Sequence, residues 1–148
     1  MNVTPIRSRL FGCSLLGAAL AAFSLPASAL NILLVNDDGL TANIQAQYDA
    51  LVAAGHDVLV SIPCQNQSAK GASINFLTPL TPLTTACLNN AASPGSPGVG
   101  EVSGKPNYHY VNGTPLMATA YGLDILAPQR WGKAPDLVLS GPNEGQNA

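Results

Sequence analysis

Charged and aromatic side chains are scarce in this 148-residue chain. Only 9% of the residues are charged and 5% are aromatic, and the 6 Lys and Arg against 8 Asp and Glu give a formal net charge of −2. So few cations cannot neutralise a run of phosphates, which argues against binding to a nucleic-acid polymer. An acidic protein that acts on an acidic small molecule needs a bound cation to offset their repulsion.

Cysteine and histidine are also few, and their spacing forms no metal-binding pattern. The chain has three cysteines, no CxxC pair and two histidines, which argues against a zinc site. Cys64 and Cys87 either form a disulfide or remain free thiols, and the sequence favours neither alternative. No Gly-x-Gly-x-x-Gly turn follows the apolar run that precedes Asp37, which counts against a nucleotide-binding module without a metal.

The longest apolar run lies near the N-terminus and has the pattern of a secretory signal peptide. Two arginines precede residues 10–25, which are almost entirely apolar, and Ala27-Ser28-Ala29 matches the small-x-small cleavage pattern. The run is short for a transmembrane helix, which needs about 20 residues. We therefore expect residues 1–29 to direct export to the periplasm or outside the cell, with no stable membrane anchor. Residues 30–148 then form the folded domain.

Short apolar stretches flank a helical pattern at the start of this domain. Residues 32–35 and 58–62 have the branched, apolar character of buried strands. Between them, residues 44–52 repeat apolar side chains at helical spacing, and Thr41 is a suitable N-cap. A strand, a helix and a strand within about thirty residues form a βαβ unit. We predict an α/β fold with a Rossmann-like, doubly wound, mostly parallel sheet and helices on both faces.

The second half of the domain is less regular. Residues 89–106 are rich in Gly, Pro, Ser and Asn, and we expect them to form a mobile loop. Three further elements are predicted: a strand at 108–111, a helix at 116–126 capped by Thr114, and a buried strand at 136–139. His109 lies between two tyrosines, so we expect the tyrosines to face the core and the histidine to face solvent.

Polar residues follow three of the predicted strands. Asn36-Asp37-Asp38-Gly39 comes directly after the first strand, Gln67-Ser68 lies in the loop after the second, and Ser140-Gly141-Pro142-Asn143 follows the last. Parallel strands place their carboxyl ends at one edge of a sheet, so we expect these loops to converge. Carboxylate, hydroxyl and amide oxygens suit Mg²⁺, Mn²⁺ or Ca²⁺, and such an ion attracts and polarises a phosphate. Each segment taken alone also fits an ordinary turn.

In this order, the segments resemble the SurE-type 5′/3′-nucleotidases, a family also described as acid phosphatases. The resemblance rests on residues 31–39, Gln67-Ser68 with Gly71-Ala72-Ser73, Thr78-Pro79-Leu80, Asn112-Gly113-Thr114-Pro115, and residues 136–147. It implies a Rossmann-like sheet, one divalent cation per subunit, Mg²⁺ or Mn²⁺, and hydrolysis of nucleoside 5′- or 3′-monophosphates. It also implies that full-length relatives are homodimers or tetramers.

The resemblance assigns roles to individual residues. It implies that the metal ligands are Asp37, Asp38, Ser68 and Asn143, of which Asp37, Asp38 and Asn143 are also catalytic. It implies that the phosphate is held by Asn36, Gly113, Thr114, Ser140 and Gly141. The family continues past the segment that ends at Asn147, so we expect this chain to be the N-terminal part of a domain truncated at its C-terminus. The alternative function is an inactive fragment that binds metal or phosphate without turnover.

Overall fold

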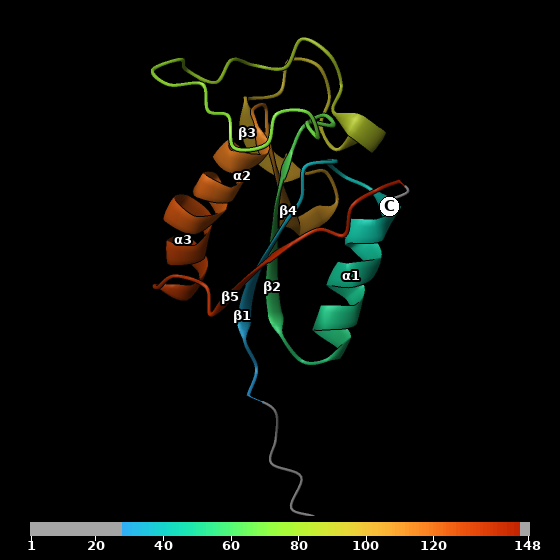
Figure 1. Cartoon of the computed structure of the whole chain (residues 1–148), viewed down its shortest axis with the longest axis vertical. Helices are drawn as coiled ribbons and strands as arrows, with labels where there is room; N and C mark the ends of the chain where they lie inside the picture. The colour runs from blue at the N-terminus through green and yellow to red at the C-terminus, as the bar shows by residue number, and fades with distance from the viewer. Residues whose placement is uncertain (1–27, 146–148) are drawn as a thin grey trace, which may run out of the picture.

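A five-stranded sheet with helices on both faces forms the centre of the molecule (Figure 1). The computed structural model describes residues 28–145, so nearly all of the predicted signal peptide, residues 1–29, lies outside the described part. The strands are β1 (Asn31–Val35), β2 (Asp57–Pro63), β3 (Val99–Val102), β4 (Lys105–Val111) and β5 (Leu137–Ser140). Their order across the sheet is β3-β4-β2-β1-β5, and only the β3–β4 pair is antiparallel. This arrangement confirms the predicted α/β fold.

The helices are short, and their starts follow the predicted caps. They are α1 (Ala42–Ala53), the 3₁₀ turn η1 (Leu88–Asn90), α2 (Pro115–Tyr121), the π-helical turn η2 (Gly122–Leu126) and α3 (Ala127–Trp131). Thr41 and Thr114 cap α1 and α2, because each hydroxyl accepts a hydrogen bond from a backbone N–H three residues later. Within residues 28–145, no helix combines the length and the apolar character required to cross a membrane.

The predicted helix at 116–126 is longer than expected and contains a wide turn. Helix α2, η2 and α3 follow one another without a break and end at Gly132, which has a left-handed φ of 66°. Pro128 lacks an N–H, and in regular α geometry its ring would collide with the carbonyl of Asp124. The π turn widens the helix at this point, with the Ala127 N–H bonded to the Gly122 carbonyl. The proline therefore distorts the helix but does not end it.

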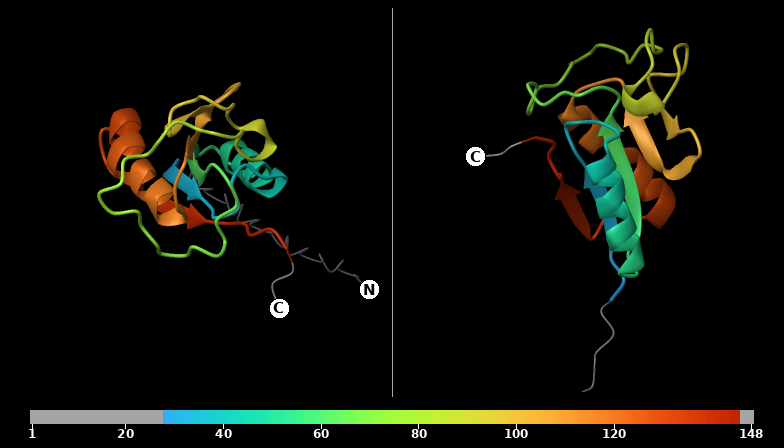
Figure 2. Two further views of the ribbon diagram at one scale, coloured as in Figure 1. Left: turned by 90° about the horizontal axis from the view of Figure 1, so that it is seen from above. Right: turned by 90° about the vertical axis from the view of Figure 1, so that its right-hand side faces the viewer.

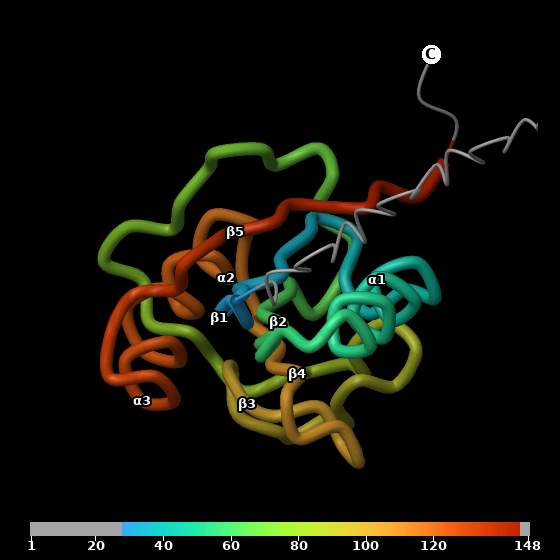
Figure 3. Tube along the Cα trace, turned by 90° about the horizontal axis from the view of Figure 1, so that it is seen from below, coloured from blue at the N-terminus to red at the C-terminus, as the bar shows by residue number. Residues whose placement is uncertain are grey.

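Alternate residues of the central strands pack against opposite helix layers. Ile32 and Leu34 belong to the buried cluster that includes Ile44 of α1. Leu33 and Val35 belong to a second cluster with Leu126 of η2. Figure 3, seen from below, shows α1 on one side of the strands and α2 with α3 on the other side. Both faces of β1 are covered, which explains why its sequence is continuously apolar.

Three predictions for the second half of the chain are wrong. Residues 89–106 are not simply a loop, because they contain β3, which extends the sheet by pairing with β4. Strand β5 is not buried: it lies at the sheet edge opposite β3 (Figure 2), and Leu137 and Val138 are each 39% exposed. His109, expected to face solvent, is half-buried beside Leu59 and Leu126, whereas Tyr108 and Tyr110 are buried in the core as predicted. In each case the partner across the sheet or from the opposing helix, not local composition, decides the environment.

Candidate functional site

The loops that carry the predicted site residues leave neighbouring strands at the same sheet edge. Strand β1 lies between β2 and β5, and all three are parallel. In register, Val35 at the end of β1 aligns with Ser61 on one side and Ser140 on the other. The predicted convergence of the loops is therefore confirmed, and the sheet order brings the first and last polar segments next to each other.

Asp38 is the centre of this convergence. Its side chain is almost fully buried, with 1% exposed. Oδ1 accepts hydrogen bonds from Asn66 Nδ2 at 2.8 Å and from Ser68 Oγ at 3.1 Å, and Oδ2 accepts one from the backbone N–H of Glu144 at 2.7 Å. A carboxylate is costly to bury without such donors. One side chain therefore ties the loops after β2 and β5 to the end of β1.

The Asn-Asp-Asp-Gly turn is shaped by a pair of hydrogen bonds across it. Asn36 Nδ2 donates to the Gly39 carbonyl at 2.8 Å, and the Gly39 N–H donates to Asn36 Oδ1 at 3.0 Å. Gly39 has φ +87°, and a Cβ at this position would lie 3.1 Å from the Pro63 carbonyl oxygen. Asn36, expected to contact phosphate, is 3% exposed and has its amide engaged in this turn. Its side chain shapes the loop that presents Asp37 and Asp38.

Two adjoining clefts open at this end of the sheet. The first, the aspartate cleft, has a volume of about 460 Å³, and its lining includes five of the predicted site residues: Asn36, Asp37, Ser140, Gly141 and Asn143. The second, the lysine cleft, has a volume of about 430 Å³ and is lined by Gln67, Ala69, Lys70, Ser73, Asn75, Asn112, Gly113 and Thr114. Gly71 and Pro115 line the first cleft while their chain neighbours Lys70 and Thr114 line the second. The predicted phosphate contacts are thus divided between two clefts.

Two further predicted phosphate contacts, besides Asn36, have polar groups engaged elsewhere. The Thr114 hydroxyl donates to the Ser73 carbonyl at 2.5 Å while it caps α2, and the residue is 4% exposed. The Gly141 N–H donates to the Val35 carbonyl at 2.8 Å and so continues the pairing of β5 with β1. These groups hold the walls of the clefts in place. Ser140 lines the aspartate cleft, and its hydroxyl is unpaired within residues 28–145.

The side chains at the aspartate cleft offer oxygen ligands. Within residues 28–145, no three His, Cys, Asp or Glu side chains gather as a metal cluster. Of the predicted ligands, Asp37 and Asn143 line the aspartate cleft, whereas the buried Asp38 and the Ser68 hydroxyl do not line it and are joined to each other by a hydrogen bond. Among the described residues, Oδ2 of Asp38 accepts one hydrogen bond, from the backbone N–H of Glu144. This donor set fits Mg²⁺ or Mn²⁺.

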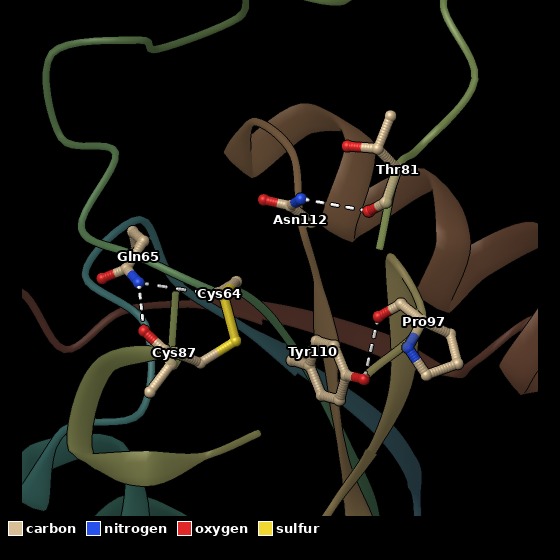
Figure 4. The surroundings of a disulfide bond; sticks show 8 residues. Cys64, Gln65, Thr81, Cys87, Pro97, Tyr110 and Asn112 are labelled. Carbon is tan, nitrogen blue, oxygen red and sulfur yellow. Dashed lines mark hydrogen bonds between the residues drawn. A yellow bond between two sulfur atoms is a disulfide. The ribbon is translucent and has the colours of Figure 1, made fainter. Parts of the chain in front are cut away.

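A disulfide closes the loop that carries Ser68. Cys64 at the end of β2 is bonded to Cys87 beside η1, which resolves the alternatives that the sequence left open (Figure 4). Gln65 Nε2 also donates to the Ala86 carbonyl at 2.7 Å, and the Gln67 N–H donates to the Asp37 carbonyl at 2.7 Å. The beginning of the loop is therefore anchored to its own end and to the Asp37 turn.

Sequence reasoning missed Asn66 as part of the site. Asn66 donates to Asp38, and its Oδ1 accepts the Ser68 N–H at 3.0 Å, so it orients the residue that was predicted as a ligand. The only sequence signal is its position two residues before Ser68. An Asn in a polar loop can have many roles. Only the long-range contact with Asp38 shows that this Asn belongs to the site.

Curated relatives include phosphatases. The chain is 36% identical over 123 residues to an acid phosphatase of Yarrowia lipolytica, which covers 81% of this chain and 34% of that protein. It is 37% identical over 119 residues to the 5′-nucleotidase SurE of Solidesulfovibrio magneticus, which covers 80% of this chain and 39% of that protein. This chain thus spans well under half the length of these relatives.

A solved structure shares the fold. The crystal structure of the SurE protein from Aquifex aeolicus aligns with a TM-score of 0.58 and 31% identity, over 79% of this chain and 39% of that one. The structural match, like the sequence matches, covers most of this chain. Residues 32–148 match the family described as survival protein SurE, and the chain therefore belongs to the SurE family.

Proposed function

We propose that the complete protein hydrolyses phosphate monoesters, with nucleoside 5′- or 3′-monophosphates as substrates and a divalent cation as cofactor. The observation that carries the proposal is the set of hydrogen bonds through which Asp38 gathers Ser68 and the Glu144 loop beside the aspartate cleft. The names of the relatives, acid phosphatase and 5′-nucleotidase SurE, support the same reaction class.

Asp37, Asp38, Ser68 and Asn143 are the residues that would hold Mg²⁺ or Mn²⁺. When bound, such a cation offsets the charge of the phosphate and lowers the pKa of a bound water to make a nucleophile. The protein's own contribution is positioning. Asp38 is fixed by three hydrogen bonds, and the half-buried Asp37 lines the cleft beside Asn143. Without a cation, the two carboxylates would repel a phosphate dianion.

Ser140 is the best-placed residue to contact the phosphate directly. It ends β5, lines the aspartate cleft, and has its hydroxyl available among the described residues. A hydroxyl can donate one hydrogen bond to a phosphate oxygen. Asn143, three residues later, lines the same cleft. The β5 end therefore supplies one metal ligand and one phosphate contact in this proposal.

We propose that the protein is exported, with residues 1–29 as its signal peptide, to the periplasm or outside the cell. The Cys64–Cys87 disulfide supports this, because such bonds persist mainly in oxidising compartments. Assembly of the complete protein into a homodimer or tetramer is part of the same proposal and rests on the family resemblance.

Hydrolysis of p-nitrophenyl phosphate tests the proposed reaction. We expect turnover with Mg²⁺ or Mn²⁺, loss of turnover with excess EDTA, and a fall of roughly 100-fold or more in kcat for Asp37→Asn. Asp49→Asn, on the exposed surface of α1, is the matched control and should retain activity. Turnover that resists EDTA, or an Asp37→Asn variant with full activity, would refute the mechanism.

A second candidate is a metal or phosphate binder without turnover. It is considered because this chain spans at most 39% of the length of the relatives described above. Titration calorimetry separates the two functions. Uptake of Mn²⁺ that depends on Asp37, with no phosphate released from p-nitrophenyl phosphate, would identify the binder.

A further inference from the structure

The lysine cleft adjoins the aspartate cleft but contains none of the predicted metal ligands. The same two chain segments border both clefts: Lys70 and Thr114 line the lysine cleft, and their chain neighbours Gly71 and Pro115 line the aspartate cleft. Its volume of about 430 Å³ lies within the range of roughly 300–1,000 Å³ typical of small-molecule sites. A phosphate monoester held by its phosphate at Asp37 and Asn143 would have this cleft as its immediate neighbour.

The walls of the lysine cleft are polar and carry two available amides. Gln67 and Asn75 line it, and within the described part of the chain neither side chain has a hydrogen-bond partner. Each amide can donate two hydrogen bonds and accept two, which matches the neighbouring hydroxyl groups of a sugar. Asn112 also lines the cleft, but its Nδ2 donates to the Thr81 carbonyl at 3.2 Å (Figure 4).

The lining favours a sugar over a nucleobase. Proteins commonly hold bases by stacking them on aromatic rings. None of the residues that line the lysine cleft, all within the described part, is aromatic. Phe76 follows Asn75 in the chain but is 76% exposed and does not line the cleft. Recognition in this cleft therefore relies on hydrogen bonds and charge.

Lys70 gives the cleft a positive charge that is not paired within the described part of the chain. The other basic residues there have partners: Arg130 pairs with Asp57 at 2.6 Å, Lys133 pairs with Asp136 at 2.6 Å, and the Lys105 ammonium lies 5.2 Å from the centre of the Tyr108 ring. A cation beside the aspartate cleft favours a phosphorylated sugar over a neutral one.

We propose that the lysine cleft is the leaving-group subsite of the phosphatase. Gln67 and Asn75 bind the hydroxyl groups of a pentose whose phosphate lies in the aspartate cleft, and Lys70 favours entry of the anionic substrate. This inference rests on the proposed function and adds to it the part of the substrate that sets specificity. The substrate class is a pentose phosphate monoester, whether or not it carries a base.

Ribose 5-phosphate is the probe that tests the subsite, with p-nitrophenyl phosphate as the reference substrate that has no sugar. In the full chain with Mn²⁺, we expect Gln67→Ala and Asn75→Ala each to lower the ratio of kcat/KM for ribose 5-phosphate to that for p-nitrophenyl phosphate by roughly 3- to 10-fold. Gln129→Ala, an exposed amide on α3, is the control and should leave the ratio unchanged. A ratio that stays at the wild-type value in both cleft variants would overturn the proposal.

A binding measurement separates failure of the subsite from failure of the proposed function. If the wild-type chain does not hydrolyse p-nitrophenyl phosphate with Mn²⁺, the proposed function fails in this chain. The subsite is then judged by calorimetric titration with ribose 5-phosphate. Affinity weakened roughly 3- to 10-fold by Gln67→Ala and Asn75→Ala supports the subsite. Wild-type affinity in both variants, or no binding to the wild-type chain, overturns it.

Discussion

The hydrogen bond between Ser68 and Asp38 can be measured as a coupling free energy. Its 3.1 Å length and the burial of the Asp38 carboxylate predict a favourable contribution to folding. Hydrogen bonds to charged groups contribute about 1.5–3 kcal/mol, and because Ser68 is exposed we place this bond somewhat below that range. We expect Ser68→Ala to lower the free energy of unfolding by about 1 kcal/mol. Asp38→Ala removes three hydrogen bonds and should lower it by about 2–4 kcal/mol.

The assay is urea denaturation of the full chain in EDTA, so that no metal contributes to the coupling. In the Asp38→Ala background, Ser68→Ala should cost close to nothing, which gives a coupling energy of about 1 kcal/mol. Ser73→Ala is the matched control, because its hydroxyl has no partner within the described residues and should show no coupling to Asp38. An equal cost of Ser68→Ala in both backgrounds would show that Asp38 does not hold the Ser68 loop.

Three further predictions concern stability. Replacing both Cys64 and Cys87 with Ser should lower the free energy of unfolding by about 3 kcal/mol, because the disulfide closes a loop with a sequence separation of 23; a urea midpoint equal to that of the oxidised wild type would contradict this. Burial lowers the pKa of His109 below 6.5, so the unfolded state binds the extra proton and stability is lost as pH falls from 6.5 towards the folded-state pKa. The variant His109→Gln should reduce this pH slope, and an unchanged slope would refute the assignment. For Gly122→Ala, the added Cβ would lie 2.7 Å from Cδ1 of the fully buried Leu33. Overpacking of about 1–3 kcal/mol should exceed the helix-propensity gain of about 1 kcal/mol, and a stabilised variant in urea denaturation would contradict this.

Local patterns in the sequence were sufficient for the first βαβ unit and for the N-caps of α1 and α2. The apolar run 32–35 forms β1 because both of its faces are covered, and Thr41 caps α1 through its own hydroxyl. The order of the polar segments was also enough to predict that the loops after β1, β2 and β5 meet, since parallel strands must end at a common edge. Asp38, Ser68 and the Asn143 loop meet there.

Long-range contacts decided the remaining features. Residues 99–102 form a strand only because β4 supplies their hydrogen-bond partners, and Gly- and Pro-rich composition hides that possibility. Asn66 becomes part of the site only through its contact with Asp38, 28 positions away. The division of the predicted phosphate contacts between two clefts likewise depends on where the loop after β2 lies against Thr114.

The sequence by itself determined the family and the mostly parallel sheet, and it contains the oxygen-bearing side chains that we propose as metal ligands. These features depend on periodicity, turn residues and the identity of a few side chains, all of which are local properties of the chain. The tertiary structure decided which of those side chains shape the loops and which line a cleft. The physical reason is that each polar group must find a partner when it is buried, and that partner is far away in the sequence for Asp38 and for Thr114.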